Sequence, residues 1–258
     1  MRALLDSLPP GAKILDLGAG PGSFSFTRMD LTLVRLDRSV PSARKSGVYI
    51  AADAARMPFV SGAFDAVVSN HSLEHFEDLE AALREVGRVV KPDGAFYVAV
   101  PDATTLTDRI YRWLGRGGGH VNAFRRPADV IGPVERHTGL KHAGTRWLFT
   151  SLSFLNNHNF IAPPPKRIAL FAFGNERCLA VFVWILRAID RRRGTRLSRY
   201  GWSFYFGSAP AHSERWINVC VRCGAGHSEA HLRKVCAAKR SYRCPDCGGW
   251  NLLSPDTK

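Results

Sequence analysis

Long apolar runs are missing from this sequence. Its longest strictly apolar stretch, Cys178–Leu186, has nine residues, whereas a membrane-spanning helix needs about 20. A secretory leader is not indicated either, because the short apolar start is followed by Pro9-Pro10-Gly11. Cysteine is also scarce, and four of the six cysteines stand in two CxxC units rather than in the pattern of a disulfide framework. We therefore expect a cytoplasmic protein.

Acidic residues are few relative to basic ones. The chain carries 22 acidic and 36 basic residues, a formal net charge of +14. The shortage is uneven, since residues 161–258 hold 17 of the basic residues and only 6 of the acidic ones. Such a basic segment favours an anionic partner, either a membrane surface or RNA. The alternative is a solvated basic face that keeps the protein soluble.

No pair of carboxylates and no Ser-His-Asp pattern stands out, so the sequence does not indicate hydrolysis. Instead, short apolar runs alternate with segments of helical periodicity. We expect strands at 13–17, 31–36, 48–51, 64–69, 95–100 and 202–206. We expect helices at 79–90, 104–114, 127–139 and 178–189, with a turn at 91–94. The alternation predicts an α/β fold whose parallel sheet has helices on both faces.

A glycine-rich loop follows the first predicted strand, in the run Ile14-Leu15-Asp16-Leu17-Gly18-Ala19-Gly20-Pro21-Gly22. Glycine permits a sharp turn and a close approach of a ligand to the backbone. The loop contains no Lys or Arg, which argues against a phosphate-binding loop. Asp37 ends the second strand and Asp53 follows the third, where carboxylates can accept from ribose hydroxyls and an adenine amino group. This pattern fits an adenosine group without phosphates.

On these residues the sequence resembles the class I S-adenosylmethionine (SAM) dependent methyltransferases, and more narrowly the bacterial type-11 methyltransferase domain. The resemblance covers Lys13 to Pro101 and also rests on the segments 53–59 and 64–75. It implies a Rossmann-like, doubly wound sheet of seven strands, the last antiparallel and formed by 202–206. It implies that the glycines pack against SAM, that Asp37 holds the ribose and that Asp53 and Ala54 border the adenine. The expected cofactor-binding residues are Asp16, Gly18, Gly20, Gly22, Asp37, Asp53, Ala54 and Asn70.

Two departures from the family pattern concern how the substrate is enclosed. Only 15 positions separate Gly22 from Asp37, so the first helix should have about two turns. The N-terminal helix that usually caps the substrate should be missing or minimal. We therefore expect a helical lid at 156–201 within a methyltransferase domain at 1–207, then a linker at 208–217.

Two histidines are candidates for a general base. His71 follows the fourth predicted strand, whose carboxyl end should face the cleft, and His120 follows a glycine run. The alternative for each is a hydrogen-bonded structural histidine. The predicted reaction transfers a methyl group from SAM to an O, N or C nucleophile of an unidentified acceptor.

Three other functions stay open. One is an RNA-directed methyltransferase, and another is a SAM-binding adaptor without catalysis. The third is a nicotinamide-dependent oxidoreductase, which is disfavoured because the loop reads GxGxG rather than GxGxxG and because Asp37 lies close to it.

A cysteine quartet marks a second unit at 218–258. Cys220 and Cys223 form one CxxC unit, and Cys244 and Cys247 form another after 20 intervening residues. Two such turns offer four thiolates to one tetrahedral ion, which predicts a structural zinc site in a zinc ribbon. Cys236 and His227 are alternative ligands. The basic residues around the quartet suggest a docking face, and a stabilising cap is the alternative: Arg222, Arg233, Lys234, Lys239, Arg240 and Arg243.

The predicted helix at 178–189 is apolar over most of its surface and is followed by Arg191–Arg193. It could lie in a membrane interface with its arginines at anionic head groups, which would place the protein peripherally at the membrane. A helix apolar on all sides is more often buried in a core or in a homodimer contact.

Overall fold

A computed structural model describes the chain except residues 25–27, 43, 115–118, 157–174, 211–215, 237–239 and 254–258. The chain divides into two compact units, each described here by itself. The first comprises Met1–Asp102, Gly119–Arg146 and Trp202–Ser213. The second comprises Ala103–Gly118, Trp147–Gly201 and Glu214–Lys258.

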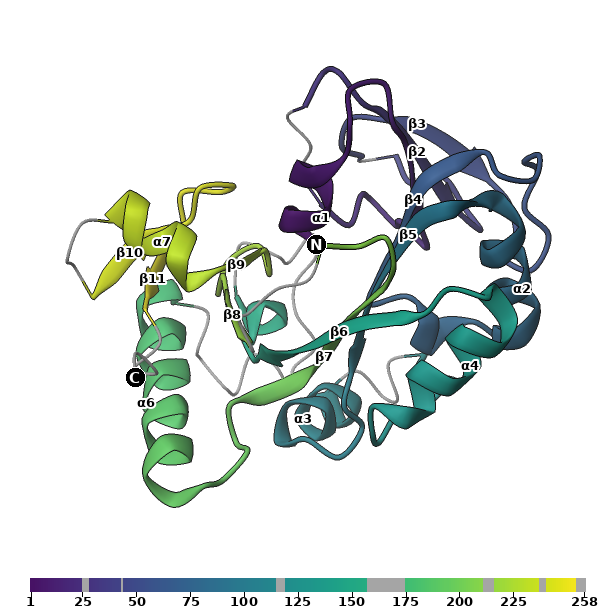
Figure 1. Ribbon diagram of the computed structural model, residues 1–258. Coiled ribbons are helices and arrows are strands. Elements are labelled where there is room, and N and C mark those ends of the chain that lie inside the picture. The colour runs from purple at the N-terminus through teal and green to yellow at the C-terminus, as the bar shows by residue number, and fades with distance from the viewer. Residues whose placement is uncertain are drawn as a thin grey trace. The chain divides into compact units, whose positions relative to one another are not determined.

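The main sheet has the strand order β3-β2-β1-β4-β5-β7-β6, with β7 antiparallel (Figure 1). Its strands are β1 (Lys13–Leu17), β2 (Thr32–Asp37), β3 (Val48–Ala51), β4 (Phe64–Asn70), β5 (Val90–Pro101), β6 (His142–Phe149) and β7 (Arg199–Gly207). The short strands β8 (Trp216–Val219) and β9 (Gly226–His227) continue the order beyond β6. The predicted seven-stranded α/β fold with an antiparallel last strand is confirmed.

The centre of this sheet is fully buried. Ile14 and Leu15 in β1 and Val67 in β4 have no exposed surface. Near-continuous apolar runs of this kind form strands that are covered on both faces. The parallel register aligns the carboxyl ends of β1, β2 and β4 at one edge, where the predicted cofactor loop begins.

Helices α2 (Leu79–Val89) and α4 (Ala128–Thr138) lie side by side in the first unit (Figure 1). The Asp78 side chain caps α2 by accepting a hydrogen bond from the Ala81 amide, and Gly139 ends α4 with φ +75°. At Gly87 an added Cβ would lie 2.8 Å from the Thr138 Cα, so this glycine permits the close approach of the two helices. A shorter helix, α1 (Arg2–Ser7), precedes β1.

Two predicted local features differ from the structure. The turn expected at 91–94 is part of β5, because Val90 already pairs with Phe64 and a register shift before Ala66 absorbs the irregular segment. The helix of about two turns expected after Gly22 is absent from the described residues 22–24 and 28–31. The described residues on either side of 25–27 form turns and bends.

The second unit contains helix α6 (Glu176–Arg193), which begins at the N-cap Asn175 and ends at Gly194 with φ +64°. Besides β8 and β9, it contains α3 (Leu106–Leu114), the 3-10 turn η2 (Ser153–Leu155), α7 (Glu229–Cys236), β10 (Ser241–Arg243) and β11 (Trp250–Leu252). Strands β10 and β11 pair antiparallel in a sheet of their own.

Helix α6 buries one face and exposes the other. Its buried residues Leu179, Ala180 and Val183 pack with Leu152, Leu155 and Val221. On the opposite face Val181 and Ile185 are exposed by 43% and 42%. Within the described part of the chain, no helix is both long enough and apolar enough to cross a membrane. The lid at 156–201 stays a prediction, since 157–174 lie outside the described residues.

Candidate functional site

The glycine loop leaves β1 through left-handed backbone conformations. Gly18, Gly20 and Gly22 have φ values of +68°, +50° and +117°. An added Cβ at Gly18 would lie 2.4 Å from the Ser72 Cβ, so this glycine is needed for close packing against the turn after β4. An added Cβ at Gly20 would meet no atom within 4 Å. Gly20 therefore presents its backbone to open space, where a ligand can approach.

Asp16 is fully buried beneath this loop. Its Oδ2 accepts a hydrogen bond from the Ser23 amide at 3.1 Å and forms an ion pair with the buried Arg35. The Arg35 guanidinium also donates to the carbonyl oxygens of Phe24 and Ser46 at 2.8 and 2.9 Å. Burial raises the pKa of Asp16, and the Ser23 and Arg35 contacts oppose that shift. Asp16 thus holds the loop in place through Arg35, a residue that the sequence analysis missed.

The other Asp16 oxygen, Oδ1, is buried and makes no hydrogen bond to the described residues. A buried acceptor without a donor costs free energy, so a donor group is expected there. The ammonium group of SAM would be such a donor.

Two further carboxylates, Asp37 and Asp53, lie at the ends of neighbouring strands. Asp37 ends β2 and pairs with Ala51, the last residue of β3, and Asp53 follows two positions later. Asp37 is half-buried, and its Oδ2 accepts a hydrogen bond from the Gly20 amide at 2.7 Å. The exposed Asp53 accepts from the Ala55 amide at 2.9 Å, and Ala54 beside it is buried. The edge therefore carries several hydrogen-bond acceptors, and its binding of an adenosine group stays a prediction.

The turn after β4 carries the candidate base His71. Its backbone is left-handed, with φ +57°, and the Ser72 hydroxyl beside it donates to the Leu17 carbonyl at 2.8 Å. Burial, together with the neighbouring His120 and His75, lowers the pKa of His71 to about 4. The His71 imidazole is therefore neutral at pH 7. Asn70, the last residue of β4, is half-buried.

The structure brings His120 to the same turn. The amides of Val121 and Asn122 donate to the Glu74 carbonyl at 2.8 and 2.9 Å. The ring centroids of His75 and His120 lie 4.9 Å apart. Both histidines selected from the sequence therefore lie in one cluster, with Glu74 and His75 as additional members. The sequence analysis did not weigh Glu74 as a ligand or base, although it lies within the segment 64–75 that carried the resemblance.

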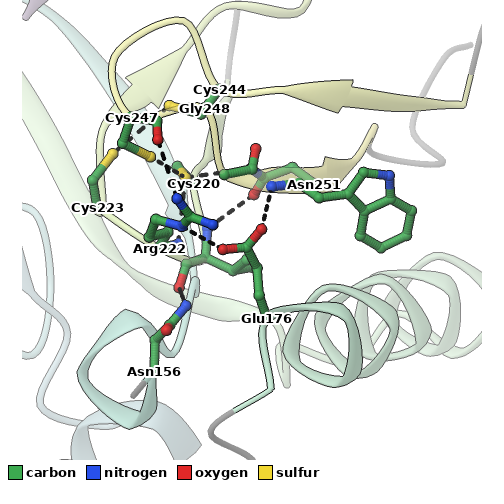
Figure 2. Close-up of polar contacts among 12 residues, drawn as sticks. Asn156, Glu176, Cys220, Arg222, Cys223, Cys244, Cys247, Gly248 and Asn251 are labelled. Carbon is green, nitrogen blue, oxygen red and sulfur yellow. Dashed lines mark hydrogen bonds and ion pairs between the residues drawn. The ribbon is translucent and has the colours of Figure 1, made fainter. Parts of the chain in front are cut away.

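The four cysteines of the two CxxC units meet in the second unit (Figure 2). The Cys220 and Cys247 sulfurs are 3.7 Å apart, and so are the Cys223 and Cys244 sulfurs. A tetrahedral zinc ion with Zn–S bonds of about 2.3 Å requires sulfur–sulfur edges of about 3.8 Å. Hydrogen bonds with Cys223 and Cys244 lower the pKa of the Cys220 thiol, which favours its thiolate form. The donor set and its spacing fit zinc.

Both cysteine pairs have the same backbone conformation. Gly224 and Gly248, each following the second cysteine, have φ values of +72° and +70°. Their amides donate to the carbonyls of Cys220 and Cys244 at 2.9 and 2.8 Å. These positive φ values explain why glycine follows each CxxC unit.

The sequence analysis named His227 and Cys236 as alternative metal ligands. His227 Nε2 lies 3.3 Å from the Cys244 sulfur and 3.5 Å from Asp246, beside the quartet. The side chain of Cys236, the other alternative ligand, lies outside the described residues, as does Lys239.

Helix α6 contacts the cysteine turns through Glu176 (Figure 2). The Glu176 carboxylate pairs with Arg222, which lies between Cys220 and Cys223, and accepts from the Trp250 amide at 2.5 Å. Arg222 was expected on an open basic face, but its guanidinium is committed to Glu176. Arg233, Lys234, Arg240 and Arg243 are exposed.

The first part of the chain matches known methyltransferases. A family model described as a methyltransferase domain, type 11, matches residues 15–98. A demethylmenaquinone methyltransferase of Mycolicibacterium paratuberculosis is 37% identical over 179 residues, covering 60% of this chain and 78% of that protein. An uncharacterized methyltransferase of Mycobacterium sp. strain KMS is 32% identical over 145 residues, covering 53% of this chain and 54% of that protein.

The chain spans about half the length of the first of its curated relatives. A putative methyltransferase of an antibiotic biosynthesis pathway from Anabaena variabilis shares the fold, with a TM-score of 0.50 and 17% identity over 80% of this chain and 95% of that one. The matched segment contains the glycine loop, Asp37, Asp53 and the turn at His71. The chain belongs to the type-11 family of class I SAM-dependent methyltransferases.

Proposed function

We propose that the protein transfers a methyl group from SAM to a nucleophile of an acceptor that is still to be identified. The observation that carries this proposal is the acceptor-rich edge formed by Asp16, Gly20 and Asp37. A ligand there meets a buried carboxylate oxygen, an open glycine backbone and a half-buried carboxylate. This environment suits a cation with a ribose and without phosphates.

Each residue at this edge has a distinct part. Asp16 Oδ1 would accept from the ligand's ammonium group, and Asp37 would accept from the ribose hydroxyls. Gly18 keeps the loop against Ser72, while Ala54 supplies buried apolar surface beside the adenine position. Bound SAM supplies an activated methyl group, so the chain's main task is to orient the acceptor for in-line displacement. If the acceptor carries a proton, His71 or His120 would be the group that removes it.

The acceptor class is tested by labelling. Purified protein is incubated with methyl-labelled SAM and with lipid, RNA and soluble fractions of the source cell. Label in any fraction, lost in the Asp37→Ala variant and kept in Asp30→Ala, supports the proposal. Absence of label in every fraction, together with intact SAM binding, favours the non-catalytic adaptor.

The exposed face of α6 favours a lipid-phase acceptor over RNA. Val181 and Ile185 expose apolar surface, and Arg191–Arg193 at the end of the helix are exposed cations. Such a helix can lie at an anionic membrane surface. The relative from M. paratuberculosis acts, by its name, on demethylmenaquinone. Label in RNA would instead support a role of the zinc ribbon in binding nucleic acid.

We also propose that the cysteine quartet holds a structural zinc ion. Four thiolates leave no open coordination position for a water or a substrate, so the ion stabilises the ribbon without reacting. Purified protein should contain one zinc ion that Cys223→Ser loses. Full zinc content in Cys223→Ser would assign the metal to other ligands.

A further inference from the structure

A second group of metal-ligating side chains lies outside the cysteine quartet, at the turn after β4. One ligand atom from each of Glu74, His75 and His120 lies within 4.8 Å of the other two. Glu74 and His75 belong to the 3-10 turn η1 (Leu73–His75), and His120 comes from a segment 45 positions further along the chain. We propose that Glu74, His75 and His120 bind a divalent transition-metal ion such as Zn²⁺.

The backbone fixes the two segments against each other before any metal arrives. The amides of Val121 and Asn122 both donate to the Glu74 carbonyl. The Asn122 side-chain amide donates to the carbonyls of Leu73 and Phe76 at 2.9 and 2.7 Å. These four hydrogen bonds hold the backbone that carries Glu74 and His75 next to the backbone that carries His120.

The His75 ring is oriented as a metal ligand. Its Nδ1 lies 3.0 Å from the Gly119 carbonyl oxygen. A carbonyl only accepts hydrogen bonds, so Nδ1 is the donor and Nε2 is the nitrogen left to face a metal ion. Metal-binding histidines commonly donate the other ring nitrogen to a carbonyl in this way.

The donor set selects the kind of ion. Two imidazoles and one carboxylate suit Zn²⁺ and its neighbours in the first transition row, whereas Mg²⁺ and Ca²⁺ prefer oxygen donors. In a tetrahedral site with bonds of about 2.0–2.1 Å the ligand atoms are about 3.4 Å apart. The present separations of up to 4.8 Å are compatible with small side-chain rotations. Three protein ligands leave one position open for a water or a substrate oxygen.

The open position gives this site a chemical use, and this step rests on the proposed methyl transfer. Gly18 of the cofactor loop packs against Ser72, which directly precedes the turn that carries Glu74 and His75. The proposed ligands therefore lie in the turn that the cofactor loop contacts. An ion there would bind an acceptor hydroxyl as a Lewis acid and lower its pKa, so that the oxygen attacks as an anion. The inferred acceptor is an oxygen nucleophile, and its proton passes to water.

Cobalt binding separates this site from the cysteine quartet. Metal-free protein is titrated with Co²⁺, which gives intense sulfur-to-metal charge-transfer absorption at thiolates and lacks it at imidazole and carboxylate ligands. We expect two equivalents, one with and one without the thiolate absorption. In His75→Ala and His120→Ala the first equivalent remains, and the second binds at least 10-fold more weakly. The control His137→Ala, altered on α4, retains both.

Three outcomes would overturn the metal site: saturation at one equivalent, thiolate absorption for both, or unchanged affinity for the second in both variants. His75 is exposed, so its replacement tests the site even where changing buried Glu74 harms folding. The role in catalysis is tested separately, by SAM binding and methyl transfer in His75→Ala. The role is supported if His75→Ala binds SAM normally but loses methyl transfer and added metal does not restore it. Full transfer without the second ion refutes the role. If the wild-type protein binds no SAM, the proposed function is refuted, whereas the number of bound metal ions still tests the metal site.

Discussion

Replacing Glu176 tests whether α6 holds the cysteine turns in place. The Glu176→Ala variant loses two contacts at once, the ion pair with Arg222 and the hydrogen bond from the Trp250 amide. The Glu176 side chain is 12% exposed and the Arg222 side chain 29%, so solvent screens the pair only in part. Glu176→Ala should leave Arg222 and the Trp250 amide without this partner.

The expected loss is about 2–3 kcal/mol in the free energy of unfolding of the second unit. The screened ion pair contributes about 1 kcal/mol, near the upper end for partly exposed pairs. The charge-assisted bond from the Trp250 amide adds about 1.5 kcal/mol or slightly more. Glu176→Gln keeps an acceptor for that amide and removes only the charge, so it should cost about 1 kcal/mol.

Two measurements are made on each variant: the free energy of unfolding in urea, and the rate of zinc release to a colorimetric chelator. Glu80→Ala is a matched control, because Glu80 also lies in the first turn of a helix and pairs with an exposed arginine, Arg84, at 3.6 Å. We expect Glu176→Ala to be the least stable and to release zinc fastest, Glu176→Gln to be intermediate, and the wild type to be the most stable and slowest. If Glu176→Ala behaves like Glu80→Ala in both measurements, the contact between α6 and the ribbon does not stabilise the unit.

Four further variants test the cofactor loop and the ribbon. Asp16→Asn leaves the Arg35 charge buried without its partner and should cost about 3–5 kcal/mol in urea unfolding, whereas unchanged stability would contradict the buried ion pair. Gly18→Ala should lower the thermal midpoint because its Cβ would overlap Ser72, while Gly20→Ala should retain more stability and lose SAM affinity at least 10-fold; equal effects on both properties would contradict the different roles of the two glycines. Cys223→Ser should lose zinc and the ordered ribbon, seen as increased amide hydrogen exchange in 218–253, and protected amides without zinc would show that the ribbon folds without the metal.

The strands and the acidic residues at their ends were predictable because both depend on local sequence. Strand β1 is a short apolar run ending in glycines, and Asp37 stands at the end of the next run. The turn expected at 91–94 failed for a long-range reason. Pairing of Val90 with Phe64 outweighs the local preference of Pro92 and Gly94 for a turn.

The missing parts of the site depend on contacts between distant segments. Arg35 lies within an apolar run, and only the fold shows that its guanidinium reaches Asp16. Glu74 and His120 are 46 positions apart, so their approach follows from the Val121 and Asn122 hydrogen bonds and not from any spacing. The cysteine quartet was predictable because the two CxxC units alone define four ligands, whereas the Glu176 contact was not.

SAM binding measured by calorimetry tests the central claim most directly. We predict that the wild-type protein binds SAM with one site per chain. Asp37→Ala should weaken that binding by about 1.5–3 kcal/mol, the value of charge-assisted hydrogen bonds. Asp30→Ala, altered at an exposed carboxylate paired with Arg28, should bind like the wild type. Binding of NADH without any binding of SAM, or unchanged SAM affinity in Asp37→Ala, would contradict the account.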